Sequence, residues 1–275
     1  MRRFHLFGSC LAILLTTALY FSQVTTADAE TKDSVAILAN VQEGDTGIKR
    51  VGRMSFAPNG VLLVADIGTA SVVAIDTGDT GPVKKLKARV NDVDKKIAAA
   101  LGTNKEGINI ADMAVNPASG KIYVSVQRKA DGLNAIITFD QNGKLAPLNL
   151  KEARYVRVSL PVEDQKKIAN ISGVEFSKDR VLAAGQSNEE FSSRIYSLPL
   201  PLTHGKSGEV YSTETYHVAH GRWETRAPIQ SFIPYQEEGE DYIVGSFACT
   251  PIAKFKISDI QKNAHIKGTS VVELG

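Results

Sequence analysis

The most distinctive chemistry in this sequence lies between His220 and Arg226. The run places the only tryptophan, Trp223, between Arg222 and Arg226, with His220 at its start. An exposed indole ring beside guanidinium groups suits the recognition of a planar, sugar-like or anionic ligand. The alternative is that Trp223 packs inside the fold and contributes only buried apolar area. We take these four side chains as candidate ligand-binding residues.

Metal-binding patterns are weak. His217 and His220 form an H-x-x-H pair, which could share a metal ion on a helix. Residues 209–220 have the composition of a strand, however, and side chains three apart on a strand point to opposite faces. The acidic run from Glu237 to Asp241 is typical of a solvated turn and lacks the spaced ligands of a calcium loop. We expect no cofactor, with weak binding of a divalent cation such as calcium as the alternative.

Familiar catalytic motifs are missing from the sequence. It contains no G-x-S-x-G, Walker, H-E-x-x-H or C-x-x-C-H motif, so the serine-hydrolase elbow, the phosphate loop, the zincin site and covalent haem lack their signatures. The 32 basic and 30 acidic residues give a net charge of +2. A balance this even produces no broad positive field, and we expect no nucleic-acid partner.

The first 29 residues have the pattern of a secretory signal peptide. Arg2 and Arg3 precede an apolar run that ends at Phe21, and the small residues Ala27 and Ala29 fit a signal-peptidase site. The run is shorter than the ~20 residues that span a bilayer, although an uncleaved anchor is the alternative. Cleavage after Ala29 predicts a secreted or periplasmic protein with no membrane span. Cys10 would leave with the leader, so that no intrachain disulfide could form.

A repeat of short apolar strands dominates residues 30–275. Its copies lie near residues 53–90, 112–160, 173–220 and 229–274. Each copy has three strands rich in Val, Ile, Phe and Tyr, and room for a fourth. Four antiparallel strands repeated in tandem predict an all-β fold, a β-propeller with four recognisable four-stranded blades. A β-sandwich also has many short strands, but it gives no reason for an internal repeat.

The predicted fourth strands and the insertions complete this interpretation. The fourth strands are expected at residues 83–90, 155–160, 209–220 and 269–274. Residues 92–101 have helical spacing and helix-forming side chains, and residues 161–169 could add a helical turn. The segment 34–41 is predicted to be a strand that closes the ring of blades. Because the fourth copy already has its own fourth strand, we expect a further blade beyond Gly275.

One part of the repeat resembles known families. Phe56-Ala-Pro-Asn-Gly-Val-Leu-Leu-Val-Ala-Asp66, followed by Ser71-Val-Val-Ala-Ile-Asp76, is similar to blades of NHL-repeat propellers and of gluconolactonase and strictosidine-synthase-like propellers. Lactonases of that group hold a divalent metal at the mouth of a central channel. The matching positions here are Arg53, Asp112, Gly173 and Ile229. Only Asp112 could be a metal ligand, and Arg53 could instead pair with it across the channel.

The loops that precede the first strands and those that join second to third strands would share one face of a propeller. That face collects Arg53, Asp112 and the run from His220 to Arg226. We therefore expect an exported, non-catalytic propeller that binds a small molecule or a protein through this face. The alternative is a metal-dependent, lactonase-like hydrolase, and a structural role in the cell envelope also stays open.

Overall fold

The computed structural model describes residues 36–162, 168–187, 192–217, 222–248, 250–260, 265–268 and 270–272. The chain divides into two compact units, Met1–Ser34 and Val35–Gly275, and the architecture below is that of the second unit. The predicted leader lies outside the described residues, as do His220, Cys249 and most of the expected helical turn at 161–169.

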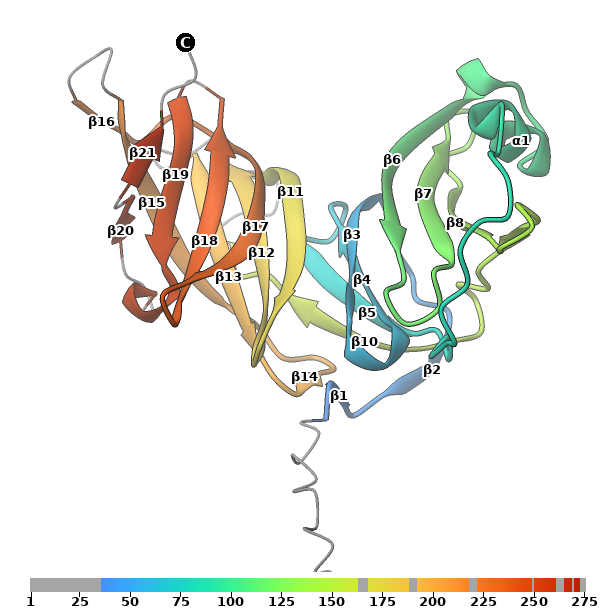
Figure 1. Ribbon diagram of the computed structural model, residues 1–275, viewed down its shortest axis with the longest axis horizontal. Helices are drawn as coiled ribbons and strands as arrows, with labels where there is room; N and C mark the ends of the chain where they lie inside the picture. The colour runs from blue at the N-terminus through green and yellow to red at the C-terminus, as the bar shows by residue number, and fades with distance from the viewer. Residues whose placement is uncertain are drawn as a thin grey trace, which may run out of the picture. The chain divides into compact units, whose positions relative to one another are not determined.

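The described chain is mostly β and forms antiparallel sheets (Figure 1). The first sheet has the order β2 (Gln42–Gly44), β10 (Ala153–Ser159), β5 (Ser71–Asp76), β4 (Val61–Asp66) and β3 (Val51–Ala57). The second has the order β6 (Ile108–Val115), β7 (Ile122–Arg128), β8 (Asn134–Phe139) and β9 (Leu145–Pro147). Short turns join consecutive strands within each copy of the repeat, as its Pro, Asn and Gly residues predict.

Two further sheets follow along the chain. The third has the order β11 (Ile168–Ser177), β12 (Arg180–Ser187), β13 (Ser193–Pro199), β15 (Glu209–His217) and β16 (Arg222–Glu224), and β20 (His265–Lys267) pairs with β15 in parallel. The fourth has the order β17 (Ile229–Glu237), β18 (Glu240–Phe247), β19 (Thr250–Lys256) and β21 (Ser270–Val272). The first three strands of every copy therefore pair as the repeat predicts.

The outer strand of the first sheet is a correction to the sequence-based prediction. Residues 83–90 form no strand, and the edge of β5 is covered instead by β10, in a register that pairs Val156 with Ala74. Consequently residues 155–160 do not complete the second sheet, whose fourth strand is the short β9. Half of the residues from 83 to 90 are Lys or Arg, whereas β10 supplies alternating valines that match the buried face of β5.

The order of the sheets along the chain is therefore not their order in space. The chain leaves the first sheet after β5, builds the second sheet and returns as β10. The innermost strand β3 packs against both β6 and β11, which places the first sheet between the second and the third. This position explains why Val61-Leu-Leu-Val-Ala-Asp66 is an almost continuous apolar run, with every residue of β4 buried.

Side chains of β4 alternate between two apolar cores, as a strand period of two requires. Leu62 and Val64 pack with Tyr123 of the second sheet, whereas Leu63 packs with Val181 of the third. Burial of each such side chain stabilises the fold by roughly 1.5–3 kcal/mol. The two cores together fix β3 and the strands beside it, which carry the residues of interest below.

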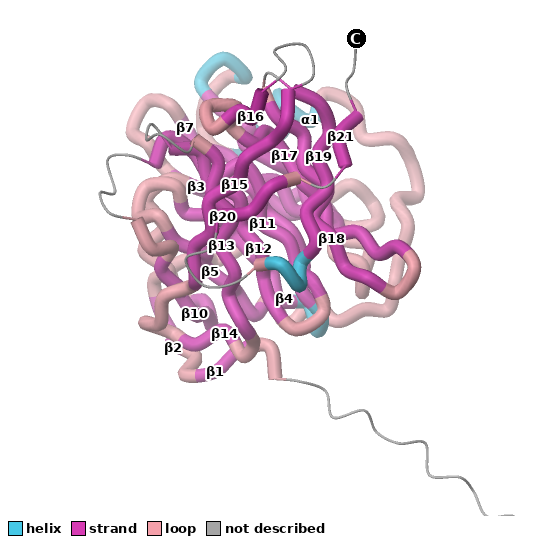
Figure 2. The backbone as a smooth tube through the Cα atoms, turned by 90° about the vertical axis from the view of Figure 1, so that its left-hand side faces the viewer, coloured by secondary structure: helices cyan, strands magenta, loops and turns pink. Residues whose placement is uncertain are grey.

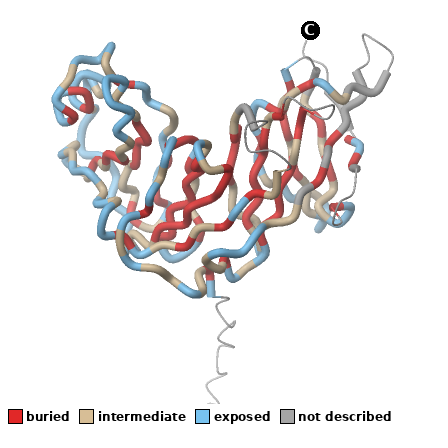
Figure 3. Tube along the Cα trace, turned by 180° about the vertical axis from the view of Figure 1, so that it is seen from behind, coloured by how far each residue is buried: buried red, intermediate tan, exposed pale blue. Residues whose placement is uncertain are grey.

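The outer sheets are covered less completely (Figure 3). Ile97 of helix α1 (Val93–Ala100) packs on one face of the second sheet, in agreement with the helix predicted at 92–101. On the fourth sheet, Ile243 and Phe255 share a core with Leu182 of the third, while Ile233 remains 57% exposed. Helical segments are short and few among the described strands (Figure 2), and none is long and apolar enough to cross a membrane.

The segment predicted to close a ring contains the short strand β1 (Leu38–Ala39). In the described residues it pairs in parallel with β14 (Leu202–Thr203), and β2 just after it pairs with β10. The expected blade beyond Gly275 stays a prediction.

Candidate functional site

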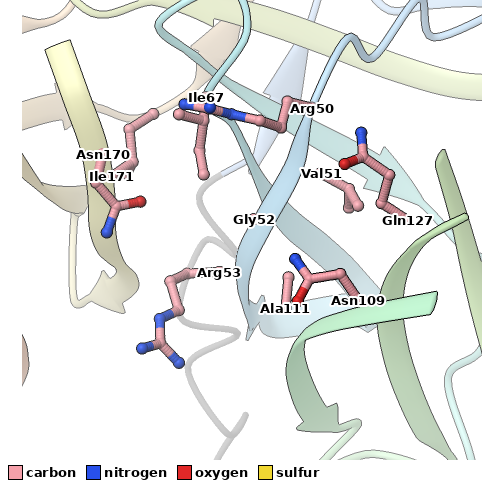
Figure 4. Close-up of a pocket in the computed structure, with 10 residues that line it drawn as sticks. All are labelled: Arg50, Val51, Gly52, Arg53, Ile67, Asn109, Ala111, Gln127, Asn170 and Ile171. Carbon is pink, nitrogen blue, oxygen red and sulfur yellow. The ribbon is translucent and has the colours of Figure 1, made fainter. Parts of the chain in front are cut away.

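A pocket opens where the innermost strands of three sheets begin. Its volume is about 300 Å³, and Figure 4 shows the side chains around it. The lining residues come from the start of β3, the starts of β6 and β11, the end of β7 and the turn after β4. They are Arg50, Val51, Gly52, Arg53, Ile67, Asn109, Ala111, Gln127, Asn170 and Ile171. This is the face on which the sequence predicted a binding site.

The polar side chains of this lining carry positive charge or none. Among the ten described lining residues there are two arginines, three carboxamides and no acid. In Figure 4 the two arginines and Asn170 lie on one side of β3, and Asn109 and Gln127 lie on the other. Guanidinium and carboxamide groups placed around one cavity provide directed N–H donors for an oxygen-rich ligand.

The predicted partnership of Arg53 with Asp112 is present. The Nη1 atom of Arg53 lies 3.4 Å from Oδ1 of Asp112, and the two side chains are 46% and 21% exposed. The other carboxylate oxygen of Asp112 accepts a hydrogen bond from the Met54 backbone N–H at 2.8 Å. Asp112 therefore links β6 to β3 through a backbone bond, and it holds the Arg53 guanidinium only by one long contact.

The loop that carries Arg50 is fixed by a buried carboxylate. Asp66, at the end of β4, is 0% exposed and accepts hydrogen bonds from the backbone N–H groups of Lys49 and Arg50 at 3.2 and 3.0 Å. The Nη1 atom of Arg157 on β10 lies 2.8 Å from the same carboxylate. The Asp of the Val-Ala-Asp motif thus has a structural role, and its carboxylate is already occupied by these donors.

Two further features shape the pocket. A Cβ atom at Gly52 would lie 2.8 Å from Cδ1 of Ile67, so the Ile67 side chain in its present position packs directly against the glycine backbone. At the start of β3, the Asn134 side chain of β8 accepts from the Val51 N–H at 3.1 Å and donates to the Lys49 carbonyl at 3.0 Å. These hydrogen bonds preorganise the backbone at the rim of the pocket.

Glu175 is a functional candidate that the sequence analysis missed. It lies on β11, and burial, together with the negative charge of Asp112, raises the pKa of its carboxyl to about 7. The available signal was its place in the repeat, because Val174-Glu175-Phe176 corresponds to Met54-Ser-Phe56. A carboxyl at a strand position that is Ser in another copy is a local departure from the pattern.

The predicted run from His220 to Arg226 lies partly outside the described residues. The backbone of Arg222 and Trp223 belongs to β16, which pairs with β15, and Arg226 is exposed. His220 lies outside the described residues. None of the ten described lining residues comes from this run.

The described residues were also compared with the ligand sets of metal sites. In the described part of the chain, no group of three or more His, Cys, Asp and Glu side chains comes together. Of the positions that match lactonase ligands, Gly173 and Ile229 have no ligating side chain, and Arg53 is the cation that contacts Asp112.

Comparisons with known proteins give the following. No protein-family model and no curated protein sequence matches this chain. A solved protein of unknown function from Bacteroides caccae matches at 9% identity over 77% of this chain and 58% of its own, with a TM-score of 0.26. The PQQ-bound aldose sugar dehydrogenase from Streptomyces coelicolor matches at 12% identity over 87% and 85% of the two chains, with a TM-score of 0.30.

A streptogramin B lyase matches at 11% identity over 84% of this chain and 78% of that chain, with a TM-score of 0.22. The dehydrogenase and the lyase are β-propellers.

Proposed function

We propose that this chain is an exported, propeller-like protein that binds a small polar molecule in the pocket between β3, β6 and β11. One observation carries the proposal: side chains from three sheets converge on a single cavity of about 300 Å³, a volume at the lower end of ordinary ligand sites. Because the cavity is concave and small, it favours a small molecule over a protein partner.

The polar groups of the pocket support binding rather than a lactonase-like reaction. A hard divalent cation needs several oxygen ligands, and Asp112 is the one carboxylate among the four matching positions. Its side chain already contacts Arg53. The metal-dependent hydrolase therefore has less support than a binding protein.

A screen of small polar compounds by thermal unfolding tests this proposal. Sugars, sugar acids and amino acids are added one at a time, because a ligand that binds only the folded chain raises its stability. Asn109→Trp would fill the pocket from an exposed strand position, and Gln236→Trp on β17 is the matched control. We expect at least one compound to raise the Tm of the wild type and of Gln236→Trp, but not that of Asn109→Trp.

Two results would contradict the proposal. If a compound stabilises Asn109→Trp as much as the wild type, the binding site lies elsewhere on the molecule. If no compound of these three classes changes the Tm, the pocket does not bind a small polar molecule of this kind.

A further inference from the structure

We infer that the ligand of this pocket is a small anion, whose carboxylate or phosphate oxygens are bound by Arg50 and by Arg53 after Arg53 leaves Asp112. The inference rests on the proposed function and names the chemical class that the same pocket selects. Two observations carry it. Arg50 and Arg53 differ in whether an acidic side chain pairs with the guanidinium group, and the backbone of the Arg50 loop is held by hydrogen bonds.

Arg50 presents a free cation on a fixed loop. No acidic side chain of the described residues pairs with its guanidinium, which lines the pocket. Its backbone is held on both sides: its N–H donates to Asp66 at 3.0 Å, and its carbonyl accepts from the Ile67 N–H at 2.9 Å. A preorganised loop lowers the entropy cost of binding, so Arg50 can anchor an anion.

Arg53 is paired, but weakly. Its single contact with Asp112 is 3.4 Å long and its side chain is 46% exposed, whereas a guanidinium binds a carboxylate best through two parallel bonds of about 2.7–2.9 Å. An anion in the pocket can offer that geometry. Asp112 keeps the hydrogen bond from Met54 N–H when Arg53 departs, so the exchange does not leave the carboxylate without a donor.

The neutral groups of the pocket fit the rest of such a ligand. The side-chain amides make long contacts of 3.4 Å: Nδ2 of Asn170 donates to Gln186, and Nε2 of Gln127 donates to Asn134 and to the Gly132 carbonyl. These amides can turn toward ligand hydroxyl or carboxylate oxygens at little cost. A cationic ligand, by contrast, would meet two guanidinium groups at close range and is disfavoured.

The test is calorimetric titration of the full chain at low ionic strength with succinate, inorganic phosphate and succinamide. Succinamide is the neutral isostere of succinate, and phosphate distinguishes the two kinds of anion. We expect an anion to bind and succinamide not to bind at concentrations up to about 10 mM, where a site of ~1 mM affinity would be filled. Binding should weaken as salt is added.

Three variants assign the contacts. Arg50→Gln should weaken anion binding by about tenfold or more, as the loss of a charge-assisted hydrogen bond implies. Asp112→Asn should tighten it several-fold, because the amide oxygen can still accept from Met54 while Arg53 is released. Arg154→Gln, which removes an exposed arginine on β10, changes the net charge as much as Arg50→Gln does and should leave the affinity unchanged.

The outcomes separate this inference from the proposed function. If succinamide binds as well as succinate, the pocket binds small molecules without selecting charge, and only the anion assignment fails. If Asp112→Asn weakens binding, Asp112 contacts the ligand itself, and the exchange of Arg53 is wrong. If neither anion nor amide binds while another neutral compound from the thermal screen does, the anion assignment again fails alone.

Discussion

At the scale of single residues, similar carboxylates have different roles according to their surroundings. Asp66 is fully buried and is satisfied by backbone N–H groups and by Arg157. Asp112 is partly exposed and shares its charge between a backbone N–H and Arg53. Glu175 is the one whose carboxyl favours the neutral form. Asp66 supports the loop that lines the pocket, Asp112 pairs with the Arg53 guanidinium group, and Glu175 makes the free energy of folding depend on pH.

Removal of the Asp66 carboxylate should be strongly destabilising. Asp66→Ala would leave the largely buried Arg157 without its partner and would release the N–H groups of the Lys49–Arg50 loop. Breaking a buried ion pair costs about 3–5 kcal/mol, to be measured by urea unfolding. Glu43→Ala breaks an exposed pair with Arg154 and should cost less than ~1 kcal/mol. Equal losses for the two variants would show that the Asp66 network is not the main support of this loop.

The pH dependence of stability should change when Glu175 is replaced. Its folded pKa of about 7 exceeds the unfolded value of about 4.3, so the neutral form is favoured by folding. That contribution is complete below about pH 4 and is lost as the pH rises through 7. Glu175→Gln should therefore be more stable than the wild type by up to ~2 kcal/mol at pH 8, after allowance for screening by solvent, with no such gain at pH 4.

The exposed Glu152→Gln is the matched control for this measurement, and its unfolding profile should follow that of the wild type from about pH 4 to pH 8. Parallel profiles for Glu175→Gln and the wild type would mean that the Glu175 carboxyl is charged in the folded protein at neutral pH.

At the scale of elements, the first three strands of each copy were readable from the sequence, but the outer strand of the first sheet and its partner were not. The alternating or continuous apolar patterns located the first three strands of each copy, because burial of one or both faces determines which side chains are apolar. The edge of β5 could accept either residues 83–90 or residues 153–159, which are far apart along the chain. Packing against the third sheet, through Val156 and Val158, selects the second.

Turns between elements also carry long-range contacts. Gly60, at the end of the Pro58–Gly60 turn, has a φ of +71°, and a Cβ there would lie 2.4 Å from the carbonyl oxygen of Asp79. Gly78 has a φ of +63°, and a Cβ there would have no neighbouring atom within 4 Å. The two glycines thus share the backbone conformation and differ in the space around them.

We expect Gly78→Ala to cost about 1 kcal/mol, the strain of a left-handed alanine. Gly60→Ala should cost at least ~2 kcal/mol more, because the backbone of residue 79 must move to relieve the overlap. Urea unfolding measures both free energies. Equal costs would show that the contact with Asp79 relaxes without penalty and that only the φ angle matters.

At the scale of the whole molecule, the pocket depends on the chain path: the second sheet is built from the segment between β5 and β10, two neighbouring strands of the first sheet. β3 contributes the arginine-bearing edge and packs against β6 and β11, so residues from positions 50, 109 and 170 reach one cavity. A simple tandem order would have placed the second sheet between the first and the third. The binding face is then a property of the assembled sheets and not of any single repeat.

The predicted leader belongs to this scale as well, because export through it would set the compartment in which the domain folds. We expect the exported protein to begin at Glu30, as mass spectrometry of the chain from the cell exterior or periplasm would show. Ala29→Arg should block processing, because the peptidase site needs a small residue, whereas Glu30→Gln should leave it unchanged. An intact Met1 on wild-type protein in the cytosolic fraction would contradict the export proposal.

The sequence by itself determined the all-β class, the helix at 92–101 and the first three strands of each copy, because periodic burial and turn chemistry are local properties. It offered the Arg53–Asp112 pair only as one of two alternatives. Only the tertiary structure decided that β10 completes the first sheet, that Arg50, Asn109 and Asn170 line one pocket, and that burial and the charge of Asp112 raise the pKa of Glu175. These outcomes depend on which surfaces exclude water together, and that is settled by packing between segments distant in the chain.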